Sequence, residues 1–142
     1  MKDGKTFVDT NILVYAYDSS AGEKHAAAAE LMKDLWNTGH GIISTQVLQE
    51  FFVTVTKKIG KPLDAGAAKT IVKDLLKWKT VVIGGEIILE AIDLHNEHNY
   101  SFWDSVIIAS ALEGGAGSLL SEDFSNTHKI KGLVIRNPFA GR

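Results

Sequence analysis

A short apolar run followed by a single acid lies near the N-terminus of the sequence, in the stretch Thr6-Phe7-Val8-Asp9-Thr10-Asn11-Ile12-Leu13-Val14-Tyr15. The apolar run predicts a short strand that ends just before Asp9. A carboxylate in an apolar setting costs free energy unless something compensates its charge. Asp9 could cap a helix that begins after it, as Thr10 and Asn11 also could, or it could bind a cation. The stretch by itself is compatible with both roles.

Three further acids lie in or beside apolar stretches later in the chain, at Glu50, Asp104 and Asp123. Glu50 falls off the apolar stripe of its predicted helix, which by itself indicates a solvated side chain. Asp104 also fits a capping box with Ser101. Asp123 follows Glu122, and either could be a ligand. A shared divalent cation would compensate several of these charges at once, because hard cations bind carboxylate oxygens.

Strand patterns alternate with helical patterns along the whole sequence. We predict strands at 6–8, 41–43, 81–83, 118–120 and 133–136, and helices at 23–36, 47–59, 65–78, 86–98 and 104–112. This alternation predicts an α/β fold, with a mostly parallel central sheet and helices on both of its faces. In such sheets ligands bind beyond the carboxyl ends of the strands. Asp9 and Asp123 each follow a predicted strand and could therefore meet at that edge.

Length and composition limit the class of protein. The chain has 142 residues, of which 45% are hydrophobic and 23% charged, which fits one globular domain over residues 1–142. It has no cysteine, which excludes disulfides and thiolate metal sites and suits a reducing compartment. No signal pattern or membrane-length apolar run is present, so we expect a cytoplasmic protein without a membrane partner.

Charge is distributed unevenly although the formal net charge is only −2. Residues 85–123 contain eight acids and no lysine or arginine, whereas residues 57–79 contain seven lysines. Residues 124–142 contain four basic residues and no acid. An acidic centre between basic segments suits a metal site beside a surface that binds phosphates. Ordinary solvated helix faces would give the same clustering.

Together, these acidic motifs resemble those of the PIN-domain nucleases. The stretch from Val8 to Tyr15 is similar to the opening motif of that family, and the later acids follow in the family's order: Glu50, then Asp104 within residues 102–111, then Asp123 within residues 120–124. The resemblance covers nearly the whole chain. Length and single-domain organisation look most like the small VapC-type toxins of bacteria and archaea. Asn137-Pro138-Phe139 is similar to the ending of one subgroup.

The resemblance implies a fold, a chemistry and partners. The expected fold is a PIN-like three-layer α/β sandwich. The expected activity is Mg²⁺- or Mn²⁺-dependent cleavage of RNA, and the expected partners are the RNA substrate, a second copy in a homodimer and a cognate antitoxin. The apolar residues Phe51, Phe52, Val53 and Val55 are too many for one buried helix side, which also indicates a partner face.

The same resemblance assigns roles to residues of this chain. The proposed catalytic and metal-binding acids are Asp9, Glu50, Asp104 and Asp123, with Glu122 as an alternative ligand. Hydroxyl and amide groups that would support them belong to Thr10, Asn11 and Ser121. Candidates for contacts with the RNA backbone are Lys57, Lys58, Lys61, Lys129, Lys131 and Arg136.

Metal-assisted hydrolysis of an RNA phosphodiester, as the toxin of a toxin–antitoxin pair, is therefore the expected function. The alternative is a catalytically silent PIN-fold module that acts through RNA or a protein partner, although a pure binder has no need for converging carboxylates. A phosphoryl-accepting regulator would also have a similar α/β sheet. It would need paired acids after the first strand, where this chain has only Asp9.

Overall fold

The central strand of the sheet is the apolar run before Asp9. The computed structural model describes residues 4–124 and 127–140. It contains a six-stranded sheet in the order β3-β2-β1-β4-β6-β5. The bounds are β1 (Thr6–Val8), β2 (Gly41–Ser44), β3 (Lys79–Val81), β4 (Ser118–Leu120), β5 (His128–Ile130) and β6 (Leu133–Arg136). All neighbouring pairs are parallel except β5 and β6.

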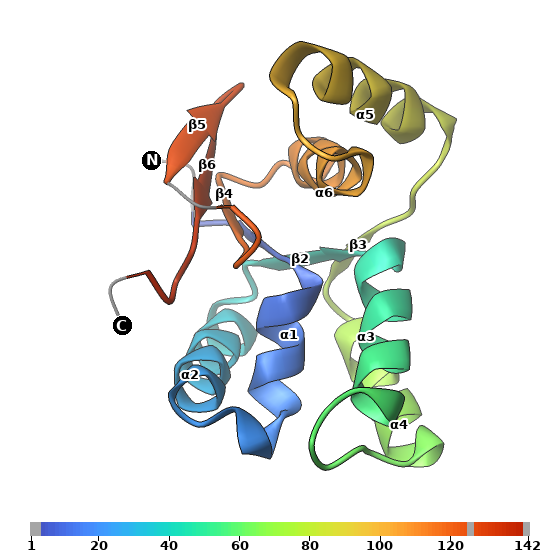
Figure 1. The fold of residues 1–142 in the computed structure, drawn as a ribbon, viewed down its shortest axis with the longest axis vertical. Coiled ribbons are helices and arrows are strands. Elements are labelled where there is room, and N and C mark those ends of the chain that lie inside the picture. The colour runs from blue at the N-terminus through green and yellow to red at the C-terminus, as the bar shows by residue number, and fades with distance from the viewer. Residues whose placement is uncertain (1–3, 125–126, 141–142) are drawn as a thin grey trace.

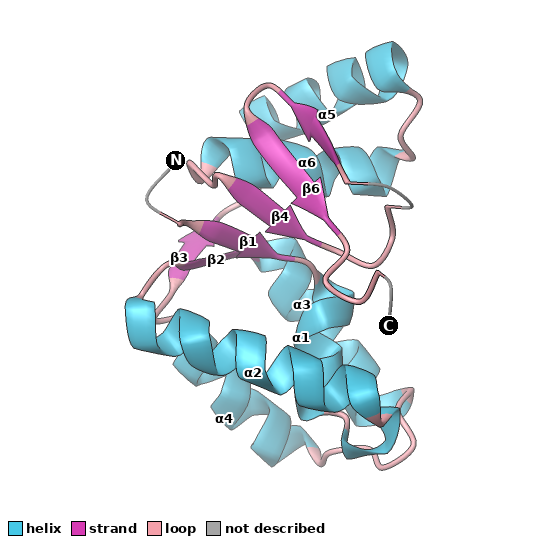
Figure 2. Cartoon of the chain, turned by 90° about the vertical axis from the view of Figure 1, so that its left-hand side faces the viewer, coloured by secondary structure: helices cyan, strands magenta, loops and turns pink. Residues whose placement is uncertain are grey.

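Helices cover both faces of this sheet, which confirms the predicted three-layer α/β fold (Figures 1 and 2). On one face lie α1 (Thr10–Tyr17), α2 (Glu23–Thr38), α3 (Thr45–Lys57) and α4 (Ala65–Leu75). A short 3₁₀ turn, η1 (Ser19–Ala21), joins α1 to α2. On the other face lie α5 (Gly85–His98) and α6 (Phe102–Glu113). The helix α6 is buried from Ser105 to Ala111, as expected for a helix that is apolar all round.

Strand order reverses at β1, and this reversal positions the candidate site. The chain runs from β1 outward through β2 to β3, then returns to form β4 on the other side of β1. Val8 pairs with Leu120, so the residues that follow β1 and β4 emerge side by side. The Asp9 amide donates to the Leu120 carbonyl over 3.0 Å. Open α/β sheets bind their ligands at such a switch point.

All the predicted elements are present, although two of them have shifted bounds, and the helix α1 was not among the predicted helices. The helix predicted at 65–78 ends at Leu75, and β3 begins at Lys79 instead of residue 81. Asp64 caps this helix as expected, since its carboxylate accepts the Ala67 amide over 2.8 Å. The strand β5 was not predicted. It is three residues long with one buried side chain, too short to show a period of two.

Close packing of helix against sheet depends on one glycine in β2. A Cβ atom at Gly41 would lie 2.4 Å from ring atoms of Trp78, well inside contact distance. The absence of a side chain therefore lets the Trp78 ring lie against β2, where it also packs edge-to-face on Trp36 at 5.4 Å between ring centroids.

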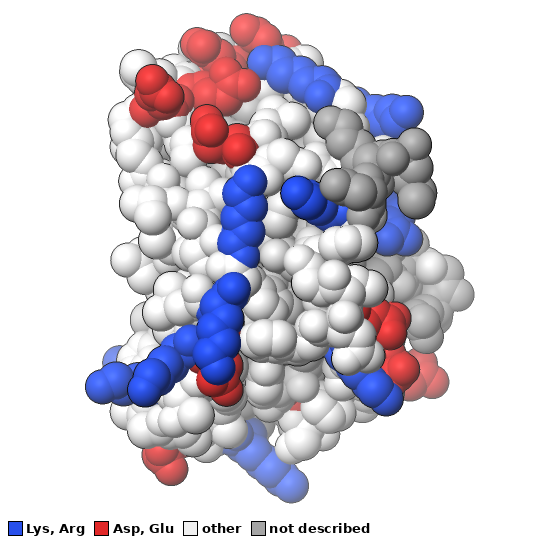
Figure 3. All heavy atoms as spheres, turned by 180° about the vertical axis from the view of Figure 1, so that it is seen from behind, with Lys and Arg blue, Asp and Glu red and all other residues white. Residues whose placement is uncertain are grey.

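The uneven charge of the sequence appears on the surface. Figure 3 shows the face opposite to that of Figure 1, where lysines and arginines form a discontinuous row and acids gather at the end occupied by α5. Within the described residues, none of the helices has the length and apolar character that crossing a bilayer requires.

Candidate active site

Asp9 is the buried residue at the centre of the site. It is only 3% exposed and caps α1 from the end of β1. Its Oδ1 accepts the Thr10 amide over 2.7 Å, and its Oδ2 accepts the Ser121 hydroxyl over 2.6 Å. The capping role and a role in the site therefore coexist in one side chain.

The charge of Asp9 is strongly disfavoured where it lies. Burial raises the pKa of Asp9 from 3.8 to about 7, although the hydrogen bonds from Ser121 and Thr10 lower it. The negative charges of Asp123 and Glu50 raise it further. A nearby cation would relieve both the burial cost and the repulsion.

Asp123 lies beside Asp9 because Ser121 connects the two. The Ser121 hydroxyl donates to Asp9 and accepts the Asp123 amide over 3.1 Å. Partial burial raises the pKa of the Asp123 carboxyl, and the charges of Asp104 and Glu122 raise it further. Hydrogen bonds with Asn11 and Asp9 lower it.

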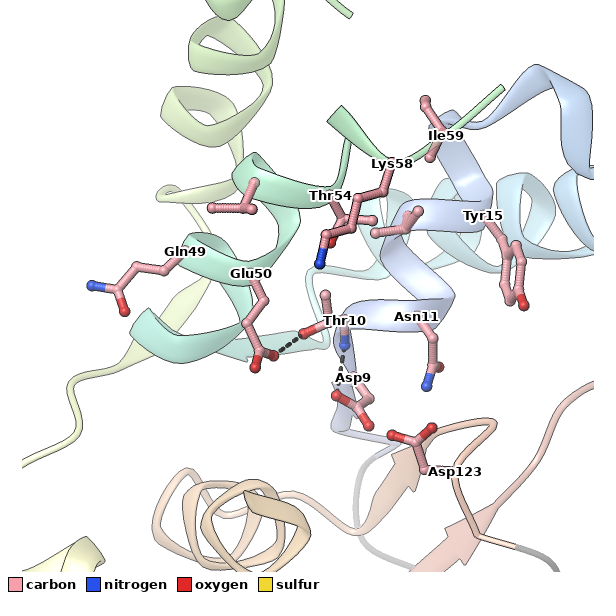
Figure 4. Close-up of a pocket in the computed structure, with 12 residues that line it drawn as sticks. Asp9, Thr10, Asn11, Tyr15, Gln49, Glu50, Thr54, Lys58, Ile59 and Asp123 are labelled. Atoms are coloured by element: carbon pink, nitrogen blue, oxygen red, sulfur yellow. Dashed lines mark hydrogen bonds between the residues drawn. The ribbon is translucent and has the colours of Figure 1, made fainter. Parts of the chain in front are cut away.

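Glu50 reaches the same cavity from α3. Its Oε1 accepts the Thr10 hydroxyl over 2.8 Å, and its Oε2 accepts the Gln46 amide over 3.4 Å. Thr10 thus contacts both Asp9 and Glu50 (Figure 4). Gln46 was not among the predicted site residues; it lies one helical turn before Glu50, a spacing that brings side chains together.

Asp104 lies in the first turn of α6, at the edge of this group. The Ser101 hydroxyl accepts the Asp104 amide over 3.1 Å, which is the serine half of the predicted capping box. Partial burial raises the pKa of Asp104, and Ser101 lowers it. Asp104 is close enough to affect the pKa of Asp123, but it does not line the cavity that Asp9, Glu50 and Asp123 share.

Glu122 points to a different set of partners. Its carboxylate accepts the Tyr15 hydroxyl over 2.6 Å and forms an ion pair with Lys24. Partial burial raises the pKa of Glu122, but the bonds from Lys24 and Tyr15 outweigh this, so the net shift is downward. The Glu122 amide donates to Asn11 over 3.1 Å, which fixes the loop while leaving the carboxylate outside the cavity.

The cavity has a volume of about 700 Å³ and lies between α1, α3 and the loop after β4 (Figure 4). The acids lie at one end, and Lys58 and Ile59 lie at the other. Of the predicted RNA-backbone residues, only Lys58 lines this cavity.

The remaining basic candidates lie elsewhere. Lys57 and Lys61 are exposed near the end of α3, and Lys131 pairs with Glu90 over 3.1 Å. Lys129 and Arg136 line a separate hollow of about 650 Å³ on the sheet face.

The site fits a hard divalent cation by the chemistry of its donors. All candidate ligands are carboxylates, and among the described residues no lysine or arginine pairs with Asp9, Glu50, Asp104 or Asp123. Within residues 4–124 and 127–140, however, no three acidic or histidine side chains lie close enough to hold an ion as they stand. Asp9, Glu50 and Asp123 share a cavity, with Glu50 turned toward Thr10 and Gln46, and Asp104 lies outside its lining.

Comparison with known families agrees with the resemblance noted in the sequence. The model of the PIN domain family matches residues 6–128. The chain belongs to the PIN domain family. A search of curated protein sequences finds no match.

Solved structures share this PIN fold at low sequence identity. A toxin–antitoxin complex from Klebsiella pneumoniae aligns with a TM-score of 0.69 at 19% identity, covering 94% of this chain and 98% of that one. VapBC2 from Rickettsia felis, bound to a DNA fragment from its promoter, aligns with a TM-score of 0.64 at 19% identity, covering 93% and 97%. VapC20 from Mycobacterium tuberculosis, a toxin that cleaves the sarcin–ricin loop, aligns with a TM-score of 0.59 at 18% identity, covering 80% and 86%.

Proposed function

We propose that this PIN domain is a metal-dependent endoribonuclease and the toxin of a toxin–antitoxin pair. The observation that carries the proposal is Asp9, a buried carboxyl with a pKa of about 7 that shares a cavity with Asp123 and Glu50 and has no cationic partner among the described residues. A structural cap does not require two further acids beside it. The family and the toxins of similar fold support the same conclusion.

The residues of the chain have distinct roles in this proposal. Asp9, Asp123, Glu50 and Asp104 would hold Mg²⁺ or Mn²⁺. Ser121 orients Asp9, Thr10 orients both Asp9 and Glu50, and Asn11 orients Asp123. When bound, the metal supplies an activated water and stabilises the leaving oxygen.

Partner proposals rest on the solved complexes and on exposed apolar surface. The Klebsiella and Rickettsia structures contain toxin–antitoxin assemblies. In this chain an apolar groove of about 500 Å³ lies between α3 and α4 and includes Phe52 and Val53. These two side chains are 37% and 45% exposed, which is consistent with a protein partner, either an antitoxin or a second copy.

The test is cleavage of RNA by the purified protein with Mg²⁺ or Mn²⁺, followed by sequencing of the new RNA ends. We expect defined ends that disappear in EDTA and in the Asp9→Asn variant, which keeps the size and capping ability of the side chain. Cleavage that survives both changes would contradict a metal site at Asp9.

The alternative is a PIN-fold module that binds without cleaving. The observation in its favour is that the described acids do not form a ready metal site. RNA binding without new ends, at any metal concentration, would identify this function.

A further inference from the structure

The cavity that holds the acids continues beyond them along α3. Glu50, Thr54 and Lys58 lie at intervals of four residues and therefore on one face of the helix. Their spacing separates the acidic end from the lysine end by about 12 Å along the helix axis. Figure 4 shows the Lys58 amine turned back into the cavity toward Thr10.

No acid among the described residues neutralises Lys58. Lys24, Lys77 and Lys131 each pair with a carboxylate, but no hydrogen bond or ion pair engages the Lys58 amine within the described part of the chain. A cation that points into a cavity without a carboxylate partner is available for a phosphate group.

The part of the cavity wall away from the acids offers apolar contact and hydrogen bonding. Val14, Val53 and Ile59 provide aliphatic surface. Thr54 lines the same wall, and within the described residues its hydroxyl has no hydrogen-bond partner, whereas Thr56 donates to the carbonyl of Phe52. Aliphatic side chains can pack against the flat face of a nucleotide base, and a hydroxyl group can form a hydrogen bond with the polar edge of the base.

We propose that this half of the cavity is a subsite for one unpaired nucleotide next to the cleaved bond. Its phosphate binds Lys58, and its base packs on Val14, Val53 and Ile59. The proposal rests on the proposed function, since it places the neighbouring phosphodiester at the acids. The volume of about 700 Å³ belongs to the whole cavity, so it accommodates the nucleotide together with the phosphodiester at the acids. A base in a duplex is stacked and paired, so its face cannot reach this wall, and the substrate must be single-stranded or looped there.

Binding of a fluorescein-labelled single-stranded RNA to the Asp9→Asn variant with Mg²⁺ tests the subsite without cleavage. Adding Lys58→Ala should weaken binding about ten-fold, because one charge-assisted contact is lost. The slope of log affinity against log salt should become less steep by about 0.7. Lys58→Arg, which keeps the charge, should restore both values. The matched control is Lys73→Ala, which removes an exposed lysine charge on α4 that does not line the cavity and is not among the predicted RNA contacts.

Two further measurements test the base pocket. The same RNA annealed to its complement should bind more weakly than the single strand, and Ile59→Ala should weaken single-strand binding without changing the salt slope. Equal losses from Lys73→Ala and Lys58→Ala would overturn the proposal, and so would equal binding of duplex and single strand, or no RNA binding at all.

The outcomes separate the subsite from the nuclease. If the wild-type protein cleaves RNA but Lys58→Ala behaves like Lys73→Ala, the subsite is wrong and the nuclease stands. If the binding differences appear but no RNA is cleaved with any metal, the subsite stands and the proposed activity is wrong.

Discussion

At the residue level, Asp9 couples stability to pH. Its pKa is about 7 in the folded protein and 3.8 in an unperturbed chain, so between these values the folded state holds a proton that the unfolded chain has released. The free energy of unfolding should therefore fall as pH rises from about 4 to about 7, by roughly 4 kcal/mol at most. Above about pH 7 the folded protein carries the full free-energy cost of burying a charged Asp9.

Asp9→Asn should remove this dependence. Without metal, we expect the melting temperature of the variant to exceed that of the wild type at about pH 8, and the difference to shrink toward about pH 4. Thermal melts in EDTA across this range provide the measurement. A wild-type protein that is the more stable of the two at the alkaline end would contradict the raised pKa.

Binding of a divalent metal should offset the free-energy cost of the charged, buried Asp9. We expect Mg²⁺ or Mn²⁺ to raise the melting temperature of the wild type, and to do so more strongly above about pH 7 than below it, because protons compete for the carboxylates. The Asp9→Asn variant should gain much less. Equal stabilisation of both proteins would indicate that the ions bind elsewhere.

Glu122 and Asp123 are neighbours with separable roles. Glu122→Gln weakens the ion pair with Lys24, so we expect a small decrease in melting temperature and cleavage close to the wild-type rate. Asp123→Asn should reduce cleavage by orders of magnitude, as loss of a metal ligand does. Cleavage rates of the wild type and both variants should be measured side by side. A severe loss of activity in Glu122→Gln would indicate that Glu122 is a metal ligand after all.

The sequence suggested which acids to examine but not how each is held. The family spacing favoured Asp123 over Glu122, but it could not show that the Glu122 carboxylate is held by Lys24 and Tyr15, which lie on other helices. Nor could it predict the deep burial of Asp9, which follows from the pairing of β1 with β4.

At the level of elements, Gly41 permits the contact between β2 and Trp78. We expect Gly41→Ala to lower the free energy of unfolding by about 1–3 kcal/mol through overpacking. Gly84→Ala is the matched control, because a Cβ atom there meets no atom within 4 Å. Chemical denaturation of both variants checks this, and equal stability would indicate that the Trp78 ring can move aside.

Elements with strong local patterns were predicted well, and those defined by tertiary pairing were not. The amphipathic α3 and the capped α4 carry their own signals in the sequence. The strand β5 exists because it pairs with β6, and its three residues have no pattern of their own. The helix α4 likewise ends at Leu75, before the predicted end at residue 78, because Trp78 turns inward against β2.

For the whole molecule, we expect a homodimer. Exposed apolar side chains occur on α3 and α5, among them Phe52, Val53, Ile88 and Leu89. A stable dimer would bury such surface. Light scattering at micromolar concentration should give twice the mass of the chain, and a monomeric mass would contradict the expectation.

The strand order also determines when this protein can become active during its synthesis. The strand β1 is translated first, yet one of its two neighbours, β4, is translated after most of the chain. Until residues 118–123 leave the ribosome, Asp9 has neither the Ser121 hydroxyl nor the Asp123 carboxylate beside it. A nascent chain that lacks these residues therefore presents an incomplete site, so the proposed activity cannot arise before residues 118–123 have been translated.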